Sequence, residues 1–261
     1  MASVTPFISA EELVARLPEV TLLDVRWRLG GPSGRGAYAE GHLPGAVFLD
    51  VDEDLCGPPG EGGRHPLPDL AELQGKLRAA GVSADRPVVV YDGGDLLAAA
   101  RTWWTLRWAG HRDVRVLEGG FPAWADGLTT ETPETKPGDF TVEPGHLPTI
   151  EADEALDFAA KNVLFDVRAA ERYRGEVEPI DSVAGHIPGA VNAPGVLPEV
   201  PADTQVGAYC GSGITAARAV LQLHATGRED AALYLGSWSH WITDPSRPIA
   251  TGEEPAKDPG Q

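Results

Sequence analysis

The sequence predicts an α/β protein with two tandem domains of the same fold, each a mainly parallel sheet with helices on both faces. Two observations lead to this prediction. Short β-branched runs alternate with helix patterns along the chain, which is typical of parallel βαβ units. The same motifs also occur twice, about 120 to 140 residues apart, whereas solenoid repeats are only about 20 to 50 residues long. The repeat therefore indicates a duplicated domain.

The internal repeat keeps its motifs in the same order in both copies. In each copy an apolar strand ends in Asp-Val-Arg, at 24–26 and 166–168, and a Gly-His-x-Pro-Gly-Ala-Val turn follows, at 41–47 and 185–191. Further along, each copy has two more matching segments. These pairs are VVVYDGG (88–94) with VGAYCGS (206–212), and VRVLEGGFPAW (114–124) with AALYLGSWSHW (231–241).

The elements expected in the first copy follow from its hydrophobic patterns and from the glycines that end its helices. The predicted strands span 21–25, 46–50, 87–92 and 114–119, and the predicted helices span 10–17, 70–81 and 96–110. In the second copy, a helix is expected to begin between Ile214 and Ala216.

The polar residues shared by the two copies are interpreted as structural, because they also occur in the copy that lacks the cysteine discussed below. We expect the Asp-Val-Arg ends to form ion pairs and the histidines of the turns to form local hydrogen bonds. The residues concerned are Asp24, Arg26, His42, Asp166, Arg168 and His186.

The domain boundaries are predicted from composition. A segment rich in proline, threonine, glycine and charge, 129–147, reads as a linker between a first domain at 1–128 and a second at 148–250. The last residues, 251–261, are expected to form a flexible tail.

Charge and hydropathy exclude several classes of partner. The 261 residues carry a formal net charge of −18, which repels phosphate backbones and anionic lipid, so we expect no nucleic-acid or membrane partner. No stretch reaches the roughly 20 apolar residues of a membrane span, and the N-terminus lacks the pattern of a secretory signal. An anionic substrate would need a local positive pocket.

The chain has two cysteines, Cys56 and Cys210, far apart in the sequence. Without a disulfide framework the protein reads as cytoplasmic, although the sequence leaves a bridge between these two residues open. Cys56 is interpreted as a loop thiol, with a redox-regulatory role left open. No His or Cys spacing resembles a zinc site, so we expect no metal and no other cofactor, and we expect a monomer.

Cys210 is the candidate nucleophile. It follows a predicted strand at the edge where parallel sheets bind ligands, and Gly211 and Gly213 allow the backbone N–H groups to point inward as an anion nest. The N-terminus of the next helix adds positive charge, and together these features stabilise a thiolate. The alternative is a buried structural thiol. Asp92 replaces the cysteine in the first copy, which predicts one active and one inert domain.

Two signatures resemble those of the tandem-domain rhodanese family of sulfurtransferases, and the resemblance covers nearly the whole chain. YAEGHLPGAVFL (38–49) matches the N-terminal signature throughout, and ALYLGSWSHW (232–241) matches the C-terminal one less fully, because Leu235 and His240 depart from it. The residues that fit the second signature are Tyr234, Gly236, Ser237, Trp238 and Trp241.

The resemblance implies a persulfide relay. A thiolate at Cys210 would take a sulfane sulfur from a small anionic donor and pass it to a thiophilic acceptor such as cyanide, a thiol or a thioredoxin-like protein. The backbone amides that would hold the outer sulfur belong to Gly211, Ser212, Gly213, Ile214, Thr215 and Ala216. Cysteine phosphatases share this fold class but need an arginine where this chain has Ala216, so that activity is excluded.

The loop after Cys210 resembles that of the 3-mercaptopyruvate sulfurtransferase branch, since it reads Cys-Gly-Ser-Gly-Ile-Thr and carries no cation. By motif, Ser212, His65 and Asp52 match the proton-handling triad of that branch. A serine polarised by a histidine and an aspartate can protonate the enolate that forms when mercaptopyruvate loses its sulfur.

The carboxylate of the donor needs a cation, and Arg172 matches one arginine of that branch's substrate clamp. The second is expected nine residues later, where this chain has Asp181, which would repel a carboxylate. Arg174 is a candidate substitute. We therefore favour 3-mercaptopyruvate as donor and keep two alternatives open, a thiosulfate:cyanide sulfurtransferase and a non-enzymatic persulfide carrier.

Overall fold

The computed structural model describes residues 5–253 and divides the chain into two compact units. The first unit runs to Gly57 and resumes over Leu67–His146. The second begins at Leu147 and also takes the segment Pro58–Pro66, which the sequence bounds assigned to the first domain. Residues 254–261 of the predicted tail lie outside the described part of the chain.

The first unit is a five-stranded sheet in the order β1-β5-β4-β2-β3, and every strand pairing described is parallel. Its strands are β1 (Phe7–Ile8), β2 (Thr21–Asp24), β3 (Val47–Phe48), β4 (Val88–Tyr91) and β5 (Val114–Leu117). Its helices are α1 (Ala10–Arg16), α2 (Arg35–Glu40), α3 (Val51–Asp54), α4 (Leu70–Ala79) and α5 (Ala98–Trp108), with the 3-10 helices η1 (Leu17–Glu19) and η2 (Phe121–Ala123).

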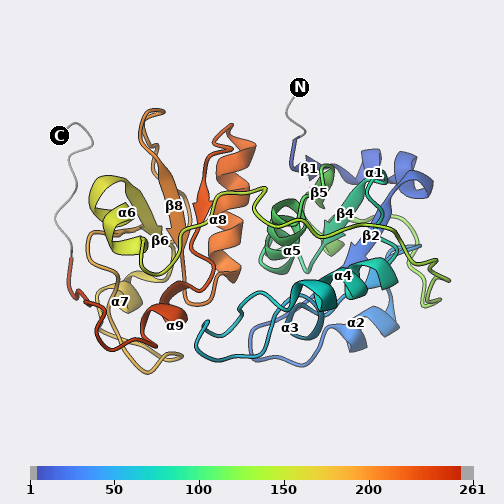
Figure 1. Ribbon diagram of the computed structural model, residues 1–261. Helices are drawn as coiled ribbons and strands as arrows, with labels where there is room; N and C mark the ends of the chain where they lie inside the picture. Colours follow the sequence, from blue (N-terminus) through green and yellow to red (C-terminus); the bar gives the residue numbers. More distant parts are fainter. Residues whose placement is uncertain (1–4, 254–261) are drawn as a thin grey trace. The chain divides into compact units, whose positions relative to one another are not determined.

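The second unit is a four-stranded parallel sheet in the order β7-β6-β8-β9. Its strands are β6 (Val163–Asp166), β7 (Val191–Asn192), β8 (Val206–Tyr209) and β9 (Ala232–Leu233). Its helices are α6 (Ala155–Lys161), α7 (Ala170–Tyr173), α8 (Ile214–Ala225) and α9 (Ser237–Trp241), and α6 and α8 lie on opposite sides of the sheet (Figure 1).

The two sheets confirm the duplication inferred from the motifs. The order β5-β4-β2-β3 of the first unit corresponds to β9-β8-β6-β7 of the second. The central strands β4 and β8 are buried along their whole length, as expected for parallel strands covered on both faces. The predicted strands and helices of the first copy are present, although β3 keeps only two residues of the predicted five.

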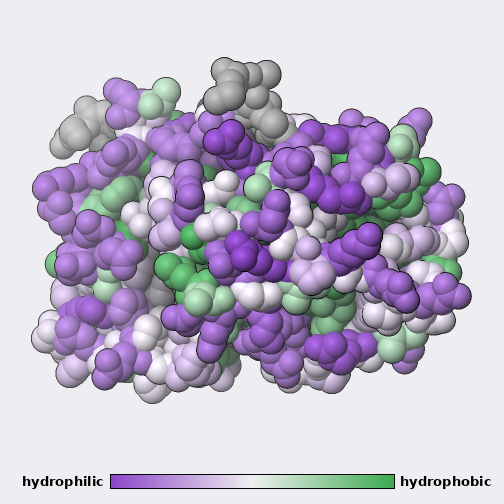
Figure 2. Space-filling model, turned by 45° about the vertical axis from the view of Figure 1, so that its right-hand side comes forward, coloured by the Kyte–Doolittle hydropathy of each residue, from purple (hydrophilic) through white to green (hydrophobic). Residues whose placement is uncertain are grey.

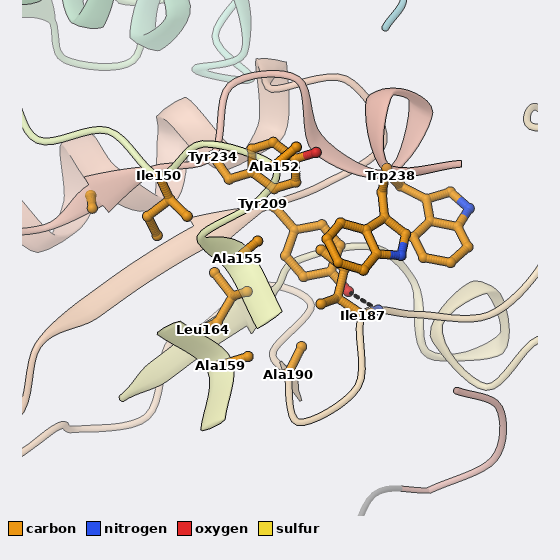
Figure 3. Packing of buried hydrophobic residues seen from close by; sticks show 12 residues of the cluster. Ile150, Ala152, Ala155, Ala159, Leu164, Ile187, Ala190, Tyr209, Tyr234 and Trp238 are labelled. Carbon is orange, nitrogen blue, oxygen red and sulfur yellow. Dashed lines mark hydrogen bonds between the residues drawn. The ribbon is translucent and has the colours of Figure 1, made fainter. Parts of the chain in front are cut away.

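The core of the second unit packs around large aromatic side chains. Figure 3 shows Tyr209, Tyr234 and Trp238 within one cluster, and the hydroxyl oxygen of Tyr209 accepts a hydrogen bond from the Ile187 N–H at 3.1 Å. A separate cluster in the first unit includes Leu22, Val89, Tyr91 and Trp124. Each unit therefore has a hydrophobic core of its own.

The Asp-Val-Arg ends form the predicted ion pairs in both units. Arg26 Nη2 lies 2.7 Å from Asp24 Oδ2, and Arg168 Nη2 lies 2.5 Å from Asp166 Oδ2. Each arginine also donates to the carbonyl of the glycine that opens the repeated turn motif, Gly41 or Gly185. A buried carboxylate without such donors would be strongly destabilising, so the pair is needed wherever the strand ends inside the protein.

The histidines of the turns have the predicted local role. His42 Nδ1 lies 2.8 Å from the Tyr38 carbonyl, and His186 Nδ1 lies 2.7 Å from the Tyr173 carbonyl. Each imidazole is also stacked on the ring of its tyrosine partner, with ring centroids 3.7 Å apart. The two buried histidines therefore hold the turn against the preceding helix.

The face shown in Figure 2 is mostly hydrophilic, and its hydrophobic residues form small separate patches. Within residues 5–253, no helix is both long enough and apolar enough to cross a membrane.

Replacing Tyr91 by phenylalanine should destabilise the first unit. Its hydroxyl donates to Asp24 Oδ2 at 2.7 Å and accepts from the Leu43 N–H at 3.3 Å, so Tyr91→Phe leaves two buried polar groups each short of a partner. We expect a loss of about 1–3 kcal/mol in the free energy of unfolding, measured by urea titration.

The matched control is Tyr234→Phe. Tyr234 is equally buried, but its hydroxyl has no hydrogen-bond partner among the described residues, so removing it should cost little. Equal losses in the two variants would show that the Asp24 network does not depend on Tyr91.

Candidate active site

Cys210 occupies the loop between β8 and α8. Its side chain is only 3% exposed, and its Sγ lies 3.2 Å from the N–H of Gly213, which points at the sulfur. Gly213 caps α8 with φ at +83°, a left-handed conformation that glycine adopts without a steric penalty. Ile214, Thr215 and Ala216 form the first turn of α8, where helix N–H groups have no partner within the helix.

The loop is held in place by α9, and this explains what the second sequence motif does. The Cys210 N–H donates to Ser237 Oγ at 3.1 Å, and the Cys210 carbonyl accepts from the Trp238 N–H at 3.0 Å. The next carbonyl, that of Gly211, accepts from the Ser239 N–H at 2.9 Å. Because both backbone groups of Cys210 are bonded to one short helix, the sulfur has a fixed position.

The segment 58–66 packs against the same helix (Figure 1). Its backbone folds back on itself through paired hydrogen bonds of 2.9 and 3.0 Å between Gly60 and Gly63. Gly63 has φ at +97°, and a Cβ there would lie 2.8 Å from Ser239 Oγ, so only glycine fits. The Arg64 N–H then donates to Ser239 Oγ at 3.1 Å. These contacts fix Arg64 and His65 within the second unit.

Ser212 and His65 are brought together although they are 147 residues apart. His65 Nδ1 lies 2.7 Å from Ser212 Oγ, and Ser212 is 6% exposed. This separation allows a hydrogen bond in either direction, depending on the tautomer of the imidazole.

Asp52, the third residue of the predicted triad, lies on α3 in the first unit. Its Oδ2 accepts a hydrogen bond from Trp27 Nε1 at 2.8 Å. Because Asp52 and His65 belong to different units, the part of Asp52 in the triad stays a prediction.

Arg172 is at the centre of a group of ion pairs. Its guanidinium donates to Glu178 Oε1 at 2.8 Å and to Asp181 Oδ2 at 3.0 Å. The other oxygen of Asp181 accepts from Arg64 Nη1. Asp181, expected to repel a donor, is therefore paired with two arginines.

Arg64 is a residue that the sequence analysis missed. It stands directly before His65, and this position was the only available signal. Arg174, the predicted substitute cation, pairs instead with Glu176 at 2.8 Å and Glu253 at 3.3 Å, and its side chain is 29% exposed.

Cys56 is the second cysteine of the chain and lies in the first unit. Both thiols are free and buried, so the disulfide left open by the sequence is not formed. Burial raises the pKa of the Cys56 thiol, and the nearby positive charge of Arg101 opposes that rise. No group of three or more His, Cys, Asp or Glu side chains within residues 5–253 is arranged to bind a metal ion.

Comparison with known proteins decides the family. The model of the Rhodanese-like domain matches two spans of the chain, residues 9–126 and 151–244. The chain belongs to the rhodanese family. The two matched spans of this rhodanese contain Asp92 and Cys210 at corresponding loop positions.

Relatives and solved structures agree with this assignment. A Pseudomonas aeruginosa protein with the provisional name 3-mercaptopyruvate sulfurtransferase is 45% identical over 94% of this chain and 98% of its own length. A Mycobacterium tuberculosis protein with the provisional name thiosulfate sulfurtransferase SseB is 43% identical over 94% and 96%. The crystal structure of SseA from Escherichia coli, a 3-mercaptopyruvate sulfotransferase, has a TM-score of 0.78 at 30% identity and covers 90% of this chain and 100% of that one. The chain is an enzyme with sulfurtransferase activity.

The first rhodanese domain has a carboxylate where the second has the thiol. Asp92 is 1% exposed, and its two oxygens accept from the N–H groups of Gly94 at 2.9 Å, Ala99 at 3.0 Å and Leu96 at 3.4 Å. Burial raises the pKa of Asp92, and the hydrogen bonds from Ala99 and Gly94 oppose that rise. The carboxylate of Asp92 thus occupies the anion nest formed by the N–H groups of its own loop.

Asp92→Asn should destabilise the first domain. An amide replaces one acceptor oxygen by a donor, so at least one of the three N–H groups loses its partner. We expect a loss of about 1–3 kcal/mol in urea unfolding at neutral pH. The control is Asp126→Asn, a change at an exposed aspartate of the same domain, which should hardly alter the free energy of unfolding. An equally small effect of Asp92→Asn would contradict the claim that the Asp92 carboxylate is needed by the N–H groups of its loop.

Proposed function

We propose that this rhodanese moves a sulfane sulfur from 3-mercaptopyruvate, through a persulfide on Cys210, to a thiophilic acceptor. The observation that supports this donor best is the 2.7 Å separation of His65 Nδ1 and Ser212 Oγ, two residues after the nucleophile. A serine–histidine pair beside a thiol is useful when the reaction has to deliver a proton to carbon.

The first half-reaction starts with the Cys210 thiolate. It attacks the sulfur of mercaptopyruvate, an S–S bond forms, and the C–S bond breaks with its electron pair moving to carbon. The products are Cys210–S–SH and the enolate of pyruvate. The persulfide then gives its proton to solvent, and its outer sulfur carries a negative charge that the N–H groups at the start of α8 can stabilise.

Ser212 and His65 complete this half-reaction. The Ser212 hydroxyl gives its proton to the terminal carbon of the enolate, which yields pyruvate. His65, as the charged imidazolium, returns its Nδ1 proton to the serine oxygen and becomes neutral, and it takes up a proton from solvent before the next turnover. Asp52 is proposed as the group that stabilises the charged imidazole.

The second half-reaction needs only a nucleophile. Cyanide, a thiolate or a thioredoxin-like protein attacks the outer sulfur, and the S–S bond breaks to return the Cys210 thiolate. Thiocyanate or the persulfide of the acceptor is released, so atoms and charge balance in each case.

Thiosulfate is the second candidate donor, and the provisional name of the Mycobacterium tuberculosis relative supports it. With thiosulfate the leaving group is sulfite, which departs as a dianion and requires no proton on carbon. The two donors therefore differ in whether they need Ser212. A non-enzymatic carrier that receives its sulfur from a partner is the remaining alternative.

The assignment of Cys210 is tested by Cys210→Ser. We expect thiocyanate formation with either donor to fall to background, and mass spectrometry to find no added sulfur on the protein after donor treatment. Cys56→Ala, which removes the other buried thiol, should retain turnover and the added sulfur. Turnover retained in Cys210→Ser would refute the persulfide at this residue.

The role of Ser212 is tested by comparing the two donors. Ser212→Ala should lower kcat with mercaptopyruvate by roughly 10²- to 10⁴-fold, the size of a lost general acid, while sulfur loading from thiosulfate stays within a few-fold. The measurement is single-turnover pyruvate or sulfite release. An equal loss with both donors would mean that Ser212 supports the loop and does not transfer a proton.

A further inference from the structure

We infer that Arg64 and Arg172 together bind the carboxylate of the donor beside Cys210, and that Asp181 orients both arginines and disfavours dianions. The inference rests on the proposed function in taking Cys210 as the reacting thiol and in taking a donor that carries a carboxylate. Arg64, more than a hundred residues before position 181, then supplies the second cation that the sequence lacks at that position.

The guanidinium groups of Arg64 and Arg172 both lie beside the loop that follows Cys210. A Cβ placed on Gly211 would lie 2.6 Å from Arg64 Nη2 and 3.5 Å from Arg172 Nη2. Both guanidiniums therefore lie against the residue that follows the nucleophile. A side chain at this position would have to displace the Arg64 guanidinium.

Arg64 has an N–H donor that no described residue uses. Arg64 Nε is buried and has no hydrogen-bond partner among the described residues, and Asp181 is the acceptor described for the side chain. A buried guanidinium N–H without a partner is costly, and an anion that reaches it would remove that cost. The side chain as a whole is 24% exposed, so part of it reaches solvent although Nε itself is buried.

The charges around Arg64 and Arg172 support the same inference. Burial lowers the pKa of Arg64, while the negative charge of the Cys210 thiolate raises it, so the two groups interact electrostatically. Arg172 forms ion pairs with two buried carboxylates, those of Glu178 and Asp181, and the side chain of each is 4% exposed. The cluster as a whole is balanced, with positive charges on Arg64, Arg168 and Arg172 and negative charges on Asp166, Glu178 and Asp181.

A balanced cluster favours a monoanion over a dianion. The single carboxylate of an α-keto acid can accept hydrogen bonds from the two guanidiniums. A dianion such as thiosulfate brings twice the charge toward Asp181, whose repulsion is screened only in part by its arginine partners. Asp181 is thus a selectivity residue that acts through the arginines it holds.

The test uses alkylation of Cys210, which is independent of any sulfur donor. In the Cys56→Ala background, the Cys210 thiolate displaces iodide from iodoacetate, which has a carboxylate, or from iodoacetamide, its neutral counterpart. The ratio of the two rates, divided by the same ratio for N-acetylcysteine, measures recognition of the carboxylate. The neutral reagent reports access and folding at the same time.

We expect the normalised ratio to be about tenfold above one in the parent protein and to fall about tenfold in Arg64→Gln, the effect of one charge-assisted hydrogen bond. Arg64→Lys should retain part of the preference. Arg115→Gln, which removes an arginine paired with Asp113 in the first unit, should leave the ratio unchanged. An unchanged ratio in Arg64→Gln, with a normal iodoacetamide rate, overturns the inference whether or not mercaptopyruvate proves to be the donor.

Asp181→Asn tests the selectivity role. It removes one negative charge while keeping an oxygen that can accept from one arginine. We expect kcat/KM for thiosulfate relative to mercaptopyruvate to rise about tenfold, and the double variant Arg64→Gln with Asp181→Asn, which restores the charge balance, to reverse that rise. A ratio that stays constant or falls in Asp181→Asn removes Asp181 from donor selection.

Discussion

The structure depends on one interaction that occurs in each unit, a buried carboxylate bonded to an arginine two residues later at the carboxyl end of a central strand. Asp166 and Arg168 are almost fully buried, and neither charge would be stable there without the other. The same arginine bonds the Gly185 carbonyl, and the next strand's Tyr209 bonds the Ile187 N–H. One charge pair thus fixes the repeated turn and the strand that leads to Cys210.

In the second unit this pair is also the start of a cluster of charged side chains beside the Cys210 loop. Arg168 Nη1 lies 3.5 Å from Glu178, which is bonded to Arg172, and Asp181 then joins Arg172 to Arg64. In the first unit the equivalent Arg26 instead lies over the ring of Phe121, with its guanidinium carbon 4.2 Å from the centroid. Both copies therefore keep the structural pair, and in the second the pair continues into a chain of alternating charges beside the thiol.

The sequence predicted the parts of this site that depend on short-range order. The loop after Cys210, the start of α8 and the paired Asp-Val-Arg ends follow from glycine placement, periodicity and repetition. The contacts of Arg64 did not, because its partner Asp181 is 117 residues away and the segment 58–66 has no periodic pattern to show which unit it joins. Asp181 looked repulsive for the same reason, since compensation of a charge requires knowing its neighbours in space.

The corresponding loops of the two units hold different side chains, Asp92 in the first and Cys210 in the second. The carboxylate of Asp92 accepts three N–H groups and leaves that nest with no capacity for an outside anion. Cys210 accepts one N–H, and a thiol is a weaker acceptor than a carboxylate, so the first turn of α8 keeps donors for a charge that arrives during the reaction. The loop of the first unit is thus satisfied by the Asp92 carboxylate, whereas the loop of the second holds a thiol bonded to the Gly213 N–H.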